Sequence, residues 1–347
     1  MTRLSALLAL SLSVLPGAAL AQVAPKPGAM KTFGNWTVGC DNTNACMMLS
    51  LAPEDGDAPP TTLLIVRDAG GDVGFRVTVE PEDGRPRGLA VDGKRLATGQ
   101  VDYDGAPAGA IVGAMANGQT LQVLNAAGKM ESTLSLKGAS AALRYMDAQQ
   151  GRVGTVTAAV AKGNAPASRV PPAPALPVVT AVIPSGVAAK PTAAQLSAMR
   201  KAAQCDLEGF AGDSSPELHA LGGGATLVLV PCSAGAYNIT AAAFVLRSGK
   251  VAPARADVPT GFGEDGSTAG PATLVNASFD KGLLQSYAKG RGIGDCGTSQ
   301  TFAWDGTRLR LTEQGEMGEC RGNTGLATIW RATVRRKQVA TSPRRRR

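Results

Sequence analysis

Apolar and polar positions alternate in short stretches along most of the chain, which is the pattern of half-buried β-strands. The first stretch runs from Phe33 to Cys40, and a polar turn at residues 41–44 then leads to Cys46. This arrangement predicts a β-hairpin closed by a disulfide. Similar stretches in the same half predict strands at residues 61–67, 73–80, 88–91, 94–97, 119–124, 132–136 and 152–160. Helices are expected at residues 106–116 and at residues 140–149, where Ser140 is a suitable N-cap.

Prolines interrupt this pattern between Gly163 and Pro191. They occur at Pro166, Pro171, Pro172, Pro174, Pro177, Pro184 and Pro191. Because proline fixes φ and lacks a backbone N–H, this density argues against a helix interior or a central strand. The segment predicts a stiff, polyproline-like linker between two domains of ordinary size.

Beyond the linker, the sequence predicts one helix followed by an antiparallel β domain. Thr192 and Gln195 fit a capping box for a helix that ends near Gln204. Residues 214–216 predict the start of a short helical turn before the glycine run at 222–224. Strands are then expected at residues 226–230, 237–247, 272–279, 283–287, 301–304, 308–312 and 327–334.

The predicted fold class is mainly β with minor α, in the form of two disulfide-stapled antiparallel β-rich domains joined by a Pro/Ala-rich linker. The expected segments are a signal peptide at residues 1–21, an N-terminal β-rich domain at 22–162, the linker at 163–191, the helix plus antiparallel β domain at 192–334, and a basic tail at 335–347.

The first residues have the three parts of a secretory signal peptide. Arg3 precedes an apolar run at residues 4–20, and Ala19-Leu20-Ala21 is a small-residue cleavage site. We therefore expect cleavage after Ala21 and a mature protein in the periplasm or secreted. No later apolar run is long enough for a transmembrane segment.

Six cysteines remain in the mature chain, an even number that favours disulfides in an exported protein. Six cysteines allow fifteen pairings. Because the linker isolates Cys40 and Cys46 from the others, the preferred pairing is Cys40 with Cys46, Cys205 with Cys232, and Cys296 with Cys320. A metal site is not expected, since the sequence has no C-x-x-C and only one histidine.

The formal net charge of +8 is concentrated at the C-terminus. Residues 331–347 contain eight basic and no acidic residues, so the remainder of the chain is close to neutral. The tail is either a solvated run that aids solubility or a contact to an anionic surface, such as phosphorylated lipid or another envelope polymer, through Arg344, Arg345, Arg346 and Arg347. Nucleic acid is not an expected partner of an exported protein.

Two short motifs match catalytic or cofactor patterns but lack the required context. Gly292 to Gly297 matches G-x-G-x-x-G, yet a hairpin rather than a helix follows it, so a glycine-rich turn beside Cys296 is expected. Ser286 and Lys289 match S-x-x-K, but a strand places them on opposite faces.

Two other features have ordinary structural explanations. His219, the single histidine, is expected at a partly exposed helical position. The loops at 102–105 and 264–266 are expected to be turns rather than calcium sites.

The few aromatic residues gather near the first and last cysteine pairs, where packing against disulfides is the simpler explanation. A candidate binding surface is formed by Trp304, Tyr287 and Arg291, because an aromatic residue, a basic residue and a glycine-rich turn lie close together in the sequence.

Three groups of residues carry a resemblance to a known family. They are Leu143-Arg144-Tyr145-Met146-Asp147-Ala148-Gln149-Gln150-Gly151-Arg152-Val153-Gly154-Thr155; the early Trp36, Cys40 and Cys46; and residues 292–297 with Trp304-Asp305-Gly306 and Gly318-Glu319-Cys320. Over nearly the whole mature chain they resemble the six-cysteine exported gram-negative proteins grouped as domain of unknown function 1176. The N-terminal half also resembles the invasion-associated locus B proteins. The resemblance implies export and an envelope setting, and it supplies no catalytic residue.

We therefore expect an exported envelope protein that serves as a non-catalytic binding or accessory module for a protein or a cell-envelope polymer. The alternative is a cell-wall-directed hydrolase, or an inhibitor of one, with serine or carboxylate chemistry that residue spacing does not reveal. The sequence predicts no catalytic residue, metal or cofactor, and it leaves open whether the protein is an enzyme.

Overall fold

The computed structural model describes residues 24–338, apart from residues 58, 84, 86, 209, 211, 262–267 and 269. The predicted signal peptide, the loop at 264–266 and the arginines Arg344 to Arg347 lie outside the described residues. The described part of the chain is mainly β and forms several sheets with three α-helices.

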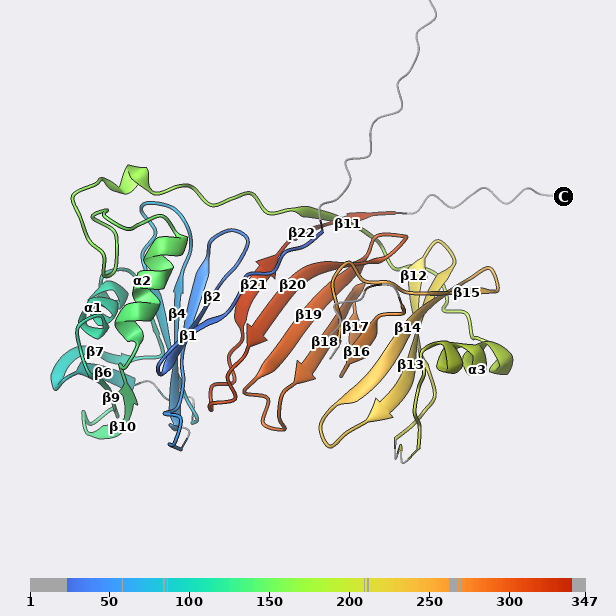
Figure 1. The fold of residues 1–347 in the computed structure, drawn as a ribbon, viewed down its shortest axis with the longest axis horizontal. Coiled ribbons are helices and arrows are strands. Elements are labelled where there is room, and N and C mark those ends of the chain that lie inside the picture. The colour runs from blue at the N-terminus through green and yellow to red at the C-terminus, as the bar shows by residue number, and fades with distance from the viewer. Residues whose placement is uncertain are drawn as a thin grey trace, which may run out of the picture.

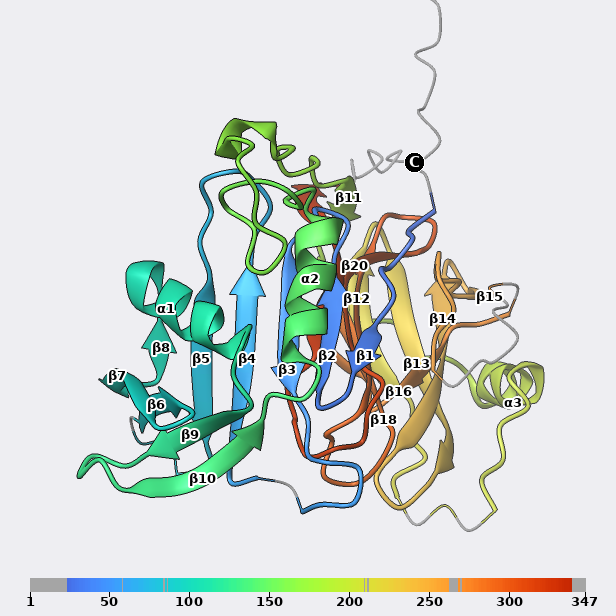
Figure 2. The ribbon, with the colours of Figure 1, turned by 60° about the vertical axis from the view of Figure 1, so that its left-hand side comes forward.

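The N-terminal half contains two antiparallel sheets. The larger sheet has the order β1 (Lys31–Phe33), β2 (Trp36–Cys40), β3 (Cys46–Ser50), β4 (Thr61–Arg67), β5 (Arg76–Pro81) and β8 (Asp102–Tyr103). The smaller sheet has the order β10 (Met130–Ser135), β9 (Thr120–Leu124), β6 (Arg87–Val91) and β7 (Lys94–Gln100). Helices α1 (Gly105–Met115) and α2 (Ala139–Gln149) cover the larger sheet, with α2 lying across β1 and β2 (Figure 2).

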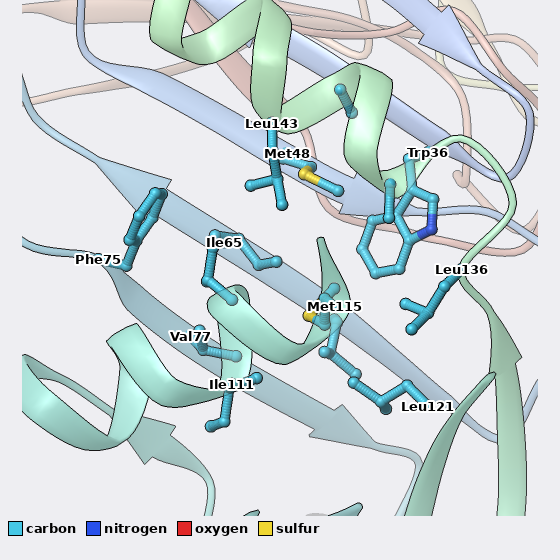
Figure 3. Packing of buried hydrophobic residues seen from close by; sticks show 14 of the residues in the cluster. Trp36, Met48, Ile65, Phe75, Val77, Ile111, Met115, Leu121, Leu136 and Leu143 are labelled. Carbon is cyan, nitrogen blue, oxygen red and sulfur yellow. The ribbon is translucent and has the colours of Figure 1, made fainter. Parts of the chain in front are cut away.

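The core of this half follows from the alternation in the strands. In β4, every second residue is buried, so Leu63 and Ile65 face the helices. Figure 3 shows how the apolar side chains of α1, α2 and the sheet meet in one cluster. Its labelled members are Trp36, Met48, Ile65, Phe75, Val77, Ile111, Met115, Leu121, Leu136 and Leu143.

The connector runs along one side of the molecule toward the C-terminal half (Figure 1), and part of it is a strand. Strand β11 (Val178–Val182) pairs in parallel with β22 (Thr333–Lys337). The prediction of a polyproline-like segment throughout is therefore wrong between Pro177 and Pro184, where the run without proline retains its backbone N–H groups for pairing with β22. The same pairing places Arg335, Arg336 and Lys337 in a strand, although the tail was expected to begin there.

The C-terminal half is a pair of antiparallel sheets. One consists of β12 (Glu217–Gly222), β13 (Ala225–Ala234), β14 (Ile239–Arg247) and β15 (Lys250–Pro253), with β16 (Thr273–Val275) also pairing with β14. The other has the order β17 (Ser278–Asp280), β18 (Leu283–Lys289), β19 (Gly297–Trp304), β20 (Leu309–Met317) and β21 (Ala327–Arg331). An apolar cluster that includes Leu227, Ala243, Phe302 and Leu311 fills the space between the sheets.

Helix α3 (Ala193–Ala202) packs on the opposite face of β13, where Met199 meets Val228 and Val230. The predicted capping box of Thr192 and Gln195 is confirmed. Two other local predictions are wrong. Residues 152–160 form turns instead of a strand, and the expected helical turn at 214–222 is replaced by β12.

Three disulfides join Cys40 to Cys46, Cys205 to Cys232 and Cys296 to Cys320, which is the preferred pairing. The first closes the hairpin of β2 and β3, as predicted. Each bond joins cysteines of the same half, so none of the three crosses the connector.

The two halves contact each other directly through β21, which lies against β2 and β3 (Figure 1). Leu49 packs with Met317 and Ala327 across this boundary. The Asn42 side chain donates to the Arg331 carbonyl at 3.0 Å and accepts from the Arg331 amide at 2.8 Å. The connector is therefore only one of the links between the halves.

Candidate functional site

The structure separates Trp304 from the other two residues of the predicted binding surface, Tyr287 and Arg291. Trp304 is 5% exposed and belongs to the cluster between the two C-terminal sheets. In the ladder of β18 and β19, Tyr287 pairs with Ser299, whereas Leu283 pairs with Ala303, the neighbour of Trp304. Trp304 and Tyr287 thus lie toward opposite ends of the hairpin. This corrects the predicted surface: the antiparallel pairing of β18 with β19 places Trp304 away from Tyr287.

Tyr287 and Arg291 do lie together, where they hold the glycine-rich turn. The Tyr287 hydroxyl donates to the Gly294 carbonyl at 2.6 Å. Arg291 forms an ion pair with Asp295, whose carboxylate is fully buried and also accepts from the Gly322 amide at 2.6 Å. The hydrogen bond from Arg291 holds the pKa of Asp295 below its ordinary value. These bonds give both residues a structural role beside the Cys296–Cys320 disulfide.

The other singled-out residues take ordinary structural positions. The Ser286 hydroxyl is buried and accepts from the Val275 amide at 2.9 Å, while Lys289 lies on the other face of the strand, as expected. His219 lies in β12 rather than in the expected helix, because residues 217–222 pair with β13, where His219 lies opposite Leu227. Its ring stacks on Phe279 with 4.7 Å between the ring centroids.

A cavity of about 660 Å³ lies at one end of the smaller N-terminal sheet, and sequence reasoning missed it. We call it the arginine cavity. Its charged and apolar lining comprises Asp83, Arg85, Arg87, Arg95, Leu124 and Glu131. These residues come from the segment before β6, from β6 and β7, and from the β9–β10 hairpin. The volume is in the range of small-molecule sites.

Strand register and one turn explain why these residues meet. Gly88 on β6 pairs with Leu124 on β9, and Leu124 pairs with Met130 on β10. The Asn125 carboxamide oxygen accepts from the amides of Ala127 and Lys129, both at 3.0 Å, and so fixes the turn between β9 and β10. This turn lines the cavity and contacts Arg95 through the Gly128 carbonyl.

Arg87 binds both of the acidic side chains that line the cavity. Arg87 is 10% exposed and donates to both carboxylate oxygens of Asp83 at 3.0 Å, and it also pairs with Glu131. The backbone hydrogen bond from Arg85, together with the Arg87 side chain, holds the pKa of Asp83 below its ordinary value. Three arginines therefore face two carboxylates, both of which are bound by Arg87.

Arg85 and Arg95 are the arginines with donors available for a ligand. The Arg85 side chain is 81% exposed and lies 3.8 Å from Asp83 at its Nε. Arg95 donates from Nη2 to the Gly128 carbonyl at 3.2 Å. Because a guanidinium carries five N–H donors, both can bind a carboxylate or phosphate without losing these contacts.

A second charged cluster lies in the core of the same half and is built from the motif at residues 143–155. Asp147 accepts from the amides of Ala159 and Val160 at 2.8 and 2.9 Å. Arg152 is fully buried and donates to the carbonyl of Gly70, among other loop carbonyls. The cluster thereby anchors the loop between β4 and β5 and the loop after α2, which explains why residues 152–160 form turns.

Comparison with known proteins identifies the family to which the chain belongs. The family model described as a protein of unknown function, DUF1176, matches residues 30–336. The chain belongs to the DUF1176 family. It is 30% identical over 339 residues to the uncharacterized protein YpfG of Escherichia coli (strain K12), a match that covers 87% of this chain and 92% of YpfG. No solved structure matches the chain.

Membership of the DUF1176 family assigns no ligand or reaction to the chain, because the function of the family is unknown. Within the described residues, no group of three or more His, Cys, Asp or Glu side chains is arranged to hold a metal ion. In the part of the chain that the structure describes, no helix combines the length and apolar character needed to cross a membrane. The three disulfides are typical of proteins outside the cytoplasm.

In this DUF1176 protein the arginine cavity had only one sequence signal, the charged turn from Asp83 to Arg87. Arg95 and Glu131 are remote from it in the sequence and join it only through the register of the sheet. Spacing rules detect sites within one element, so a site spread over four strands is not visible to them.

Proposed function

We propose that this DUF1176 protein is an exported, non-catalytic binding module of the cell envelope, and that the arginine cavity holds an anionic group of its ligand. The observation that carries the proposal is the placement of Arg85 and Arg95 on one cavity whose carboxylates are already bound by Arg87. Planar guanidinium groups match the paired oxygens of carboxylates and phosphates, which are common in envelope polymers and lipids.

The charged state of Asp83 argues against its use as the general acid of the hydrolase alternative. A general acid needs a carboxyl group whose pKa is raised toward neutrality. Asp83 has the opposite shift, because hydrogen bonds from the Arg85 amide and the Arg87 side chain stabilise its charged form. Its role in the proposal is to hold Arg87 and the turn before β6, so that Arg85 and Arg95 face the cavity.

Export is the second part of the proposal. It is supported by the signal-peptide pattern at residues 1–21 and by three disulfides, each of which joins cysteines within one half of the chain. Expression of the full chain in a gram-negative host tests this part by mass spectrometry of the periplasmic fraction. A mature chain that begins at Gln22 supports it, and full-length protein retained in the cytoplasm contradicts it.

Isothermal titration of residues 22–347 with inorganic pyrophosphate and with citrate tests the cavity. Replacing both Arg85 and Arg95 by glutamine removes two cationic donors, so the affinity should fall by about tenfold or more. Binding should also weaken with added salt, because the charges are partly exposed.

The matched control is Arg144→Gln, which removes an exposed arginine of α2 that does not line the cavity. It should leave the affinity unchanged. Equal losses in the control and in the Arg85/Arg95 variant would point to nonspecific charge effects and would remove the basis of the proposal, as would the absence of binding by the unmodified chain.

A further inference from the structure

A second hollow, of about 420 Å³, lies between the loop before β5, the exposed side of α1 and the loop after α2. We call it the glycine groove, because Gly105, Gly109 and Gly113 of α1 form one of its walls. Val156 is 56% exposed and adds apolar surface, and the buried Phe75, Val112 and Arg67 lie beneath the groove. The arginine cavity and the glycine groove have no lining residue in common.

Two of the three glycines have no explanation in the packing of the chain itself. Residues 109 and 113 are one helical turn apart and lie on the same face of α1. A Cβ atom added at either position would meet nothing within 4 Å, and neither residue has a positive φ. Glycine weakens a helix relative to alanine. What these glycines provide is bare backbone on the wall of the groove, which leaves room for another molecule to approach closely.

The floor of the groove carries a buried guanidinium with an unused donor. The Arg67 side chain is 5% exposed; its Nε donates to the Val73 carbonyl at 3.1 Å and its Nη2 to the Thr157 carbonyl at 2.7 Å. Its Nη1 has no hydrogen-bond acceptor among the described residues, and the nearest acid oxygen, on Asp147, is 3.7 Å away. The guanidinium carbon lies 4.3 Å from the centre of the Phe75 ring.

The charge around Arg67 is also incomplete. Arg67 and Arg152 are both buried, and Asp147 is the carboxylate whose charge acts on both of them. Burial and the charge of Arg152 lower the pKa of Arg67 to about 10, against the opposing effect of Asp147. At the rim, the exposed Asp72 and Lys162 have opposite signs. The interior beneath the groove therefore holds one positive charge more than its acid offsets.

We infer that the glycine groove is a binding site for a small organic anion, whose apolar body lies between the glycine face of α1 and Val156 and whose acidic group is directed toward Arg67. The acid would balance the excess buried charge beside Arg67, and the apolar body would cover the exposed Val156. This site is separate from the arginine cavity, so it adds to the proposed function and does not depend on it.

Fluorescence titration with two matched dyes tests the inference. 1-Anilinonaphthalene-8-sulfonate is an aromatic monoanion, and N-phenyl-1-naphthylamine has the same ring skeleton without the sulfonate. Residues 22–347 carrying Arg85→Gln and Arg95→Gln are used, so that the arginine cavity does not compete for the anion. The sulfonate should bind at least about tenfold more tightly than the neutral dye.

Gly109→Leu fills the groove, and Ala110→Leu adds the same side chain to an exposed position of α1 outside it. Gly109→Leu should weaken sulfonate binding by about tenfold or more, and Ala110→Leu should leave it unchanged. Since leucine favours a helix over glycine, the melting temperature of Gly109→Leu should not fall, so lost binding is not lost folding. If Gly109→Leu does melt earlier, Gly113→Leu repeats the test.

Equal affinity for the two dyes would overturn the role assigned to the buried positive charge. Equal effects of the glycine variants and Ala110→Leu would overturn the location. Failure of pyrophosphate binding with success of the groove titration would reject the arginine cavity and leave this inference standing.

Discussion

Asp295 is a buried carboxylate whose charge is held by one partly exposed arginine. Arg291 and the Gly322 amide bind its two oxygens, and the Cys296–Cys320 disulfide joins the two segments that carry them. Because the hydrogen bond from Arg291 lowers the pKa of Asp295 in the folded protein, the bond stabilises the fold whenever Asp295 is charged.

The pH dependence of stability follows from this shift. The contribution of Asp295 is fully present above the unfolded-state pKa of about 3.9, and it is lost as the pH falls through the lower folded-state pKa. Arg291→Gln should therefore lower the free energy of unfolding at pH 7 and flatten its decline below about pH 4. Urea unfolding at a series of pH values, with Arg144→Gln as the control, measures both effects. Parallel pH curves for Arg291→Gln and the unmodified chain would contradict the assignment.

At the scale of single elements, helices α1 and α2 use glycine for different reasons. Gly138 precedes α2 with a φ of +93°, and an added Cβ would lie 1.8 Å from the Phe33 carbonyl oxygen. Gly113 lies within α1, where an added Cβ meets open space. The first glycine is required by the backbone, and the second is not.

The two positions should respond to alanine with opposite signs. Gly113→Ala should stabilise the protein by about 0.5 to 1 kcal/mol, because alanine loses less conformational entropy in a helix. Gly138→Ala should destabilise it by about 1 kcal/mol or more, because the left-handed backbone and the Phe33 contact both resist a Cβ. Chemical denaturation measures the two changes, and changes of the same sign would disprove this distinction.

Elements with strong local patterns were predictable from the sequence. The alternation in β4, the capping box of α3 and the hairpin closed by Cys40 and Cys46 depend on neighbouring residues only. The failures occurred where distant groups decide the structure. Residues 152–160 alternate like a strand, but Arg152 and Asp147 bind loop backbone there and hold turns instead.

The candidate site was less predictable than the fold for the same reason. The arginine cavity brings together Arg95 and Glu131 through the pairing of four strands, and no rule of spacing gives their register. The residues that did look like a surface in the sequence, Trp304 and Tyr287, were separated by the pairing of β18 with β19.

At the scale of the whole molecule, the halves are joined by polar bonds from the loop before β21 as well as by the apolar packing around Leu49. Arg321 donates from Nη1 to the Gly34 carbonyl at 2.9 Å, from Nη2 to the Asn35 side chain at 3.0 Å, and from Nε to the Ala52 carbonyl at 2.7 Å. Asn323 adds a bond of 2.8 Å to the Ser50 carbonyl. We expect these contacts to make the two halves unfold together.

Arg321→Ala tests this coupling. It leaves the carbonyls of Gly34 and Ala52 without their donor, so it should cost about 2 kcal/mol or more and separate the melting of the halves. Scanning calorimetry should show one transition for the unmodified chain and a broadened or double transition for the variant. Arg308→Ala, at an exposed position of the turn between β19 and β20, is the control. Two transitions in the unmodified chain would show that the halves are independent.

The boundary between the halves also determines which contacts form first and which form last as the chain folds from its N-terminus. The disulfides close within each half, over sequence separations of 6, 27 and 24 residues, so each can form as soon as its own segment is available. The face of β2 and β3, in contrast, meets β21 nearly the whole chain later, and contacts of such separation form slowly. Until that strand arrives, the apolar surface around Leu49 is uncovered. An incomplete chain in which only the N-terminal half has folded is therefore the species most prone to aggregation. Strand β21 removes this risk when it packs on β2 and β3.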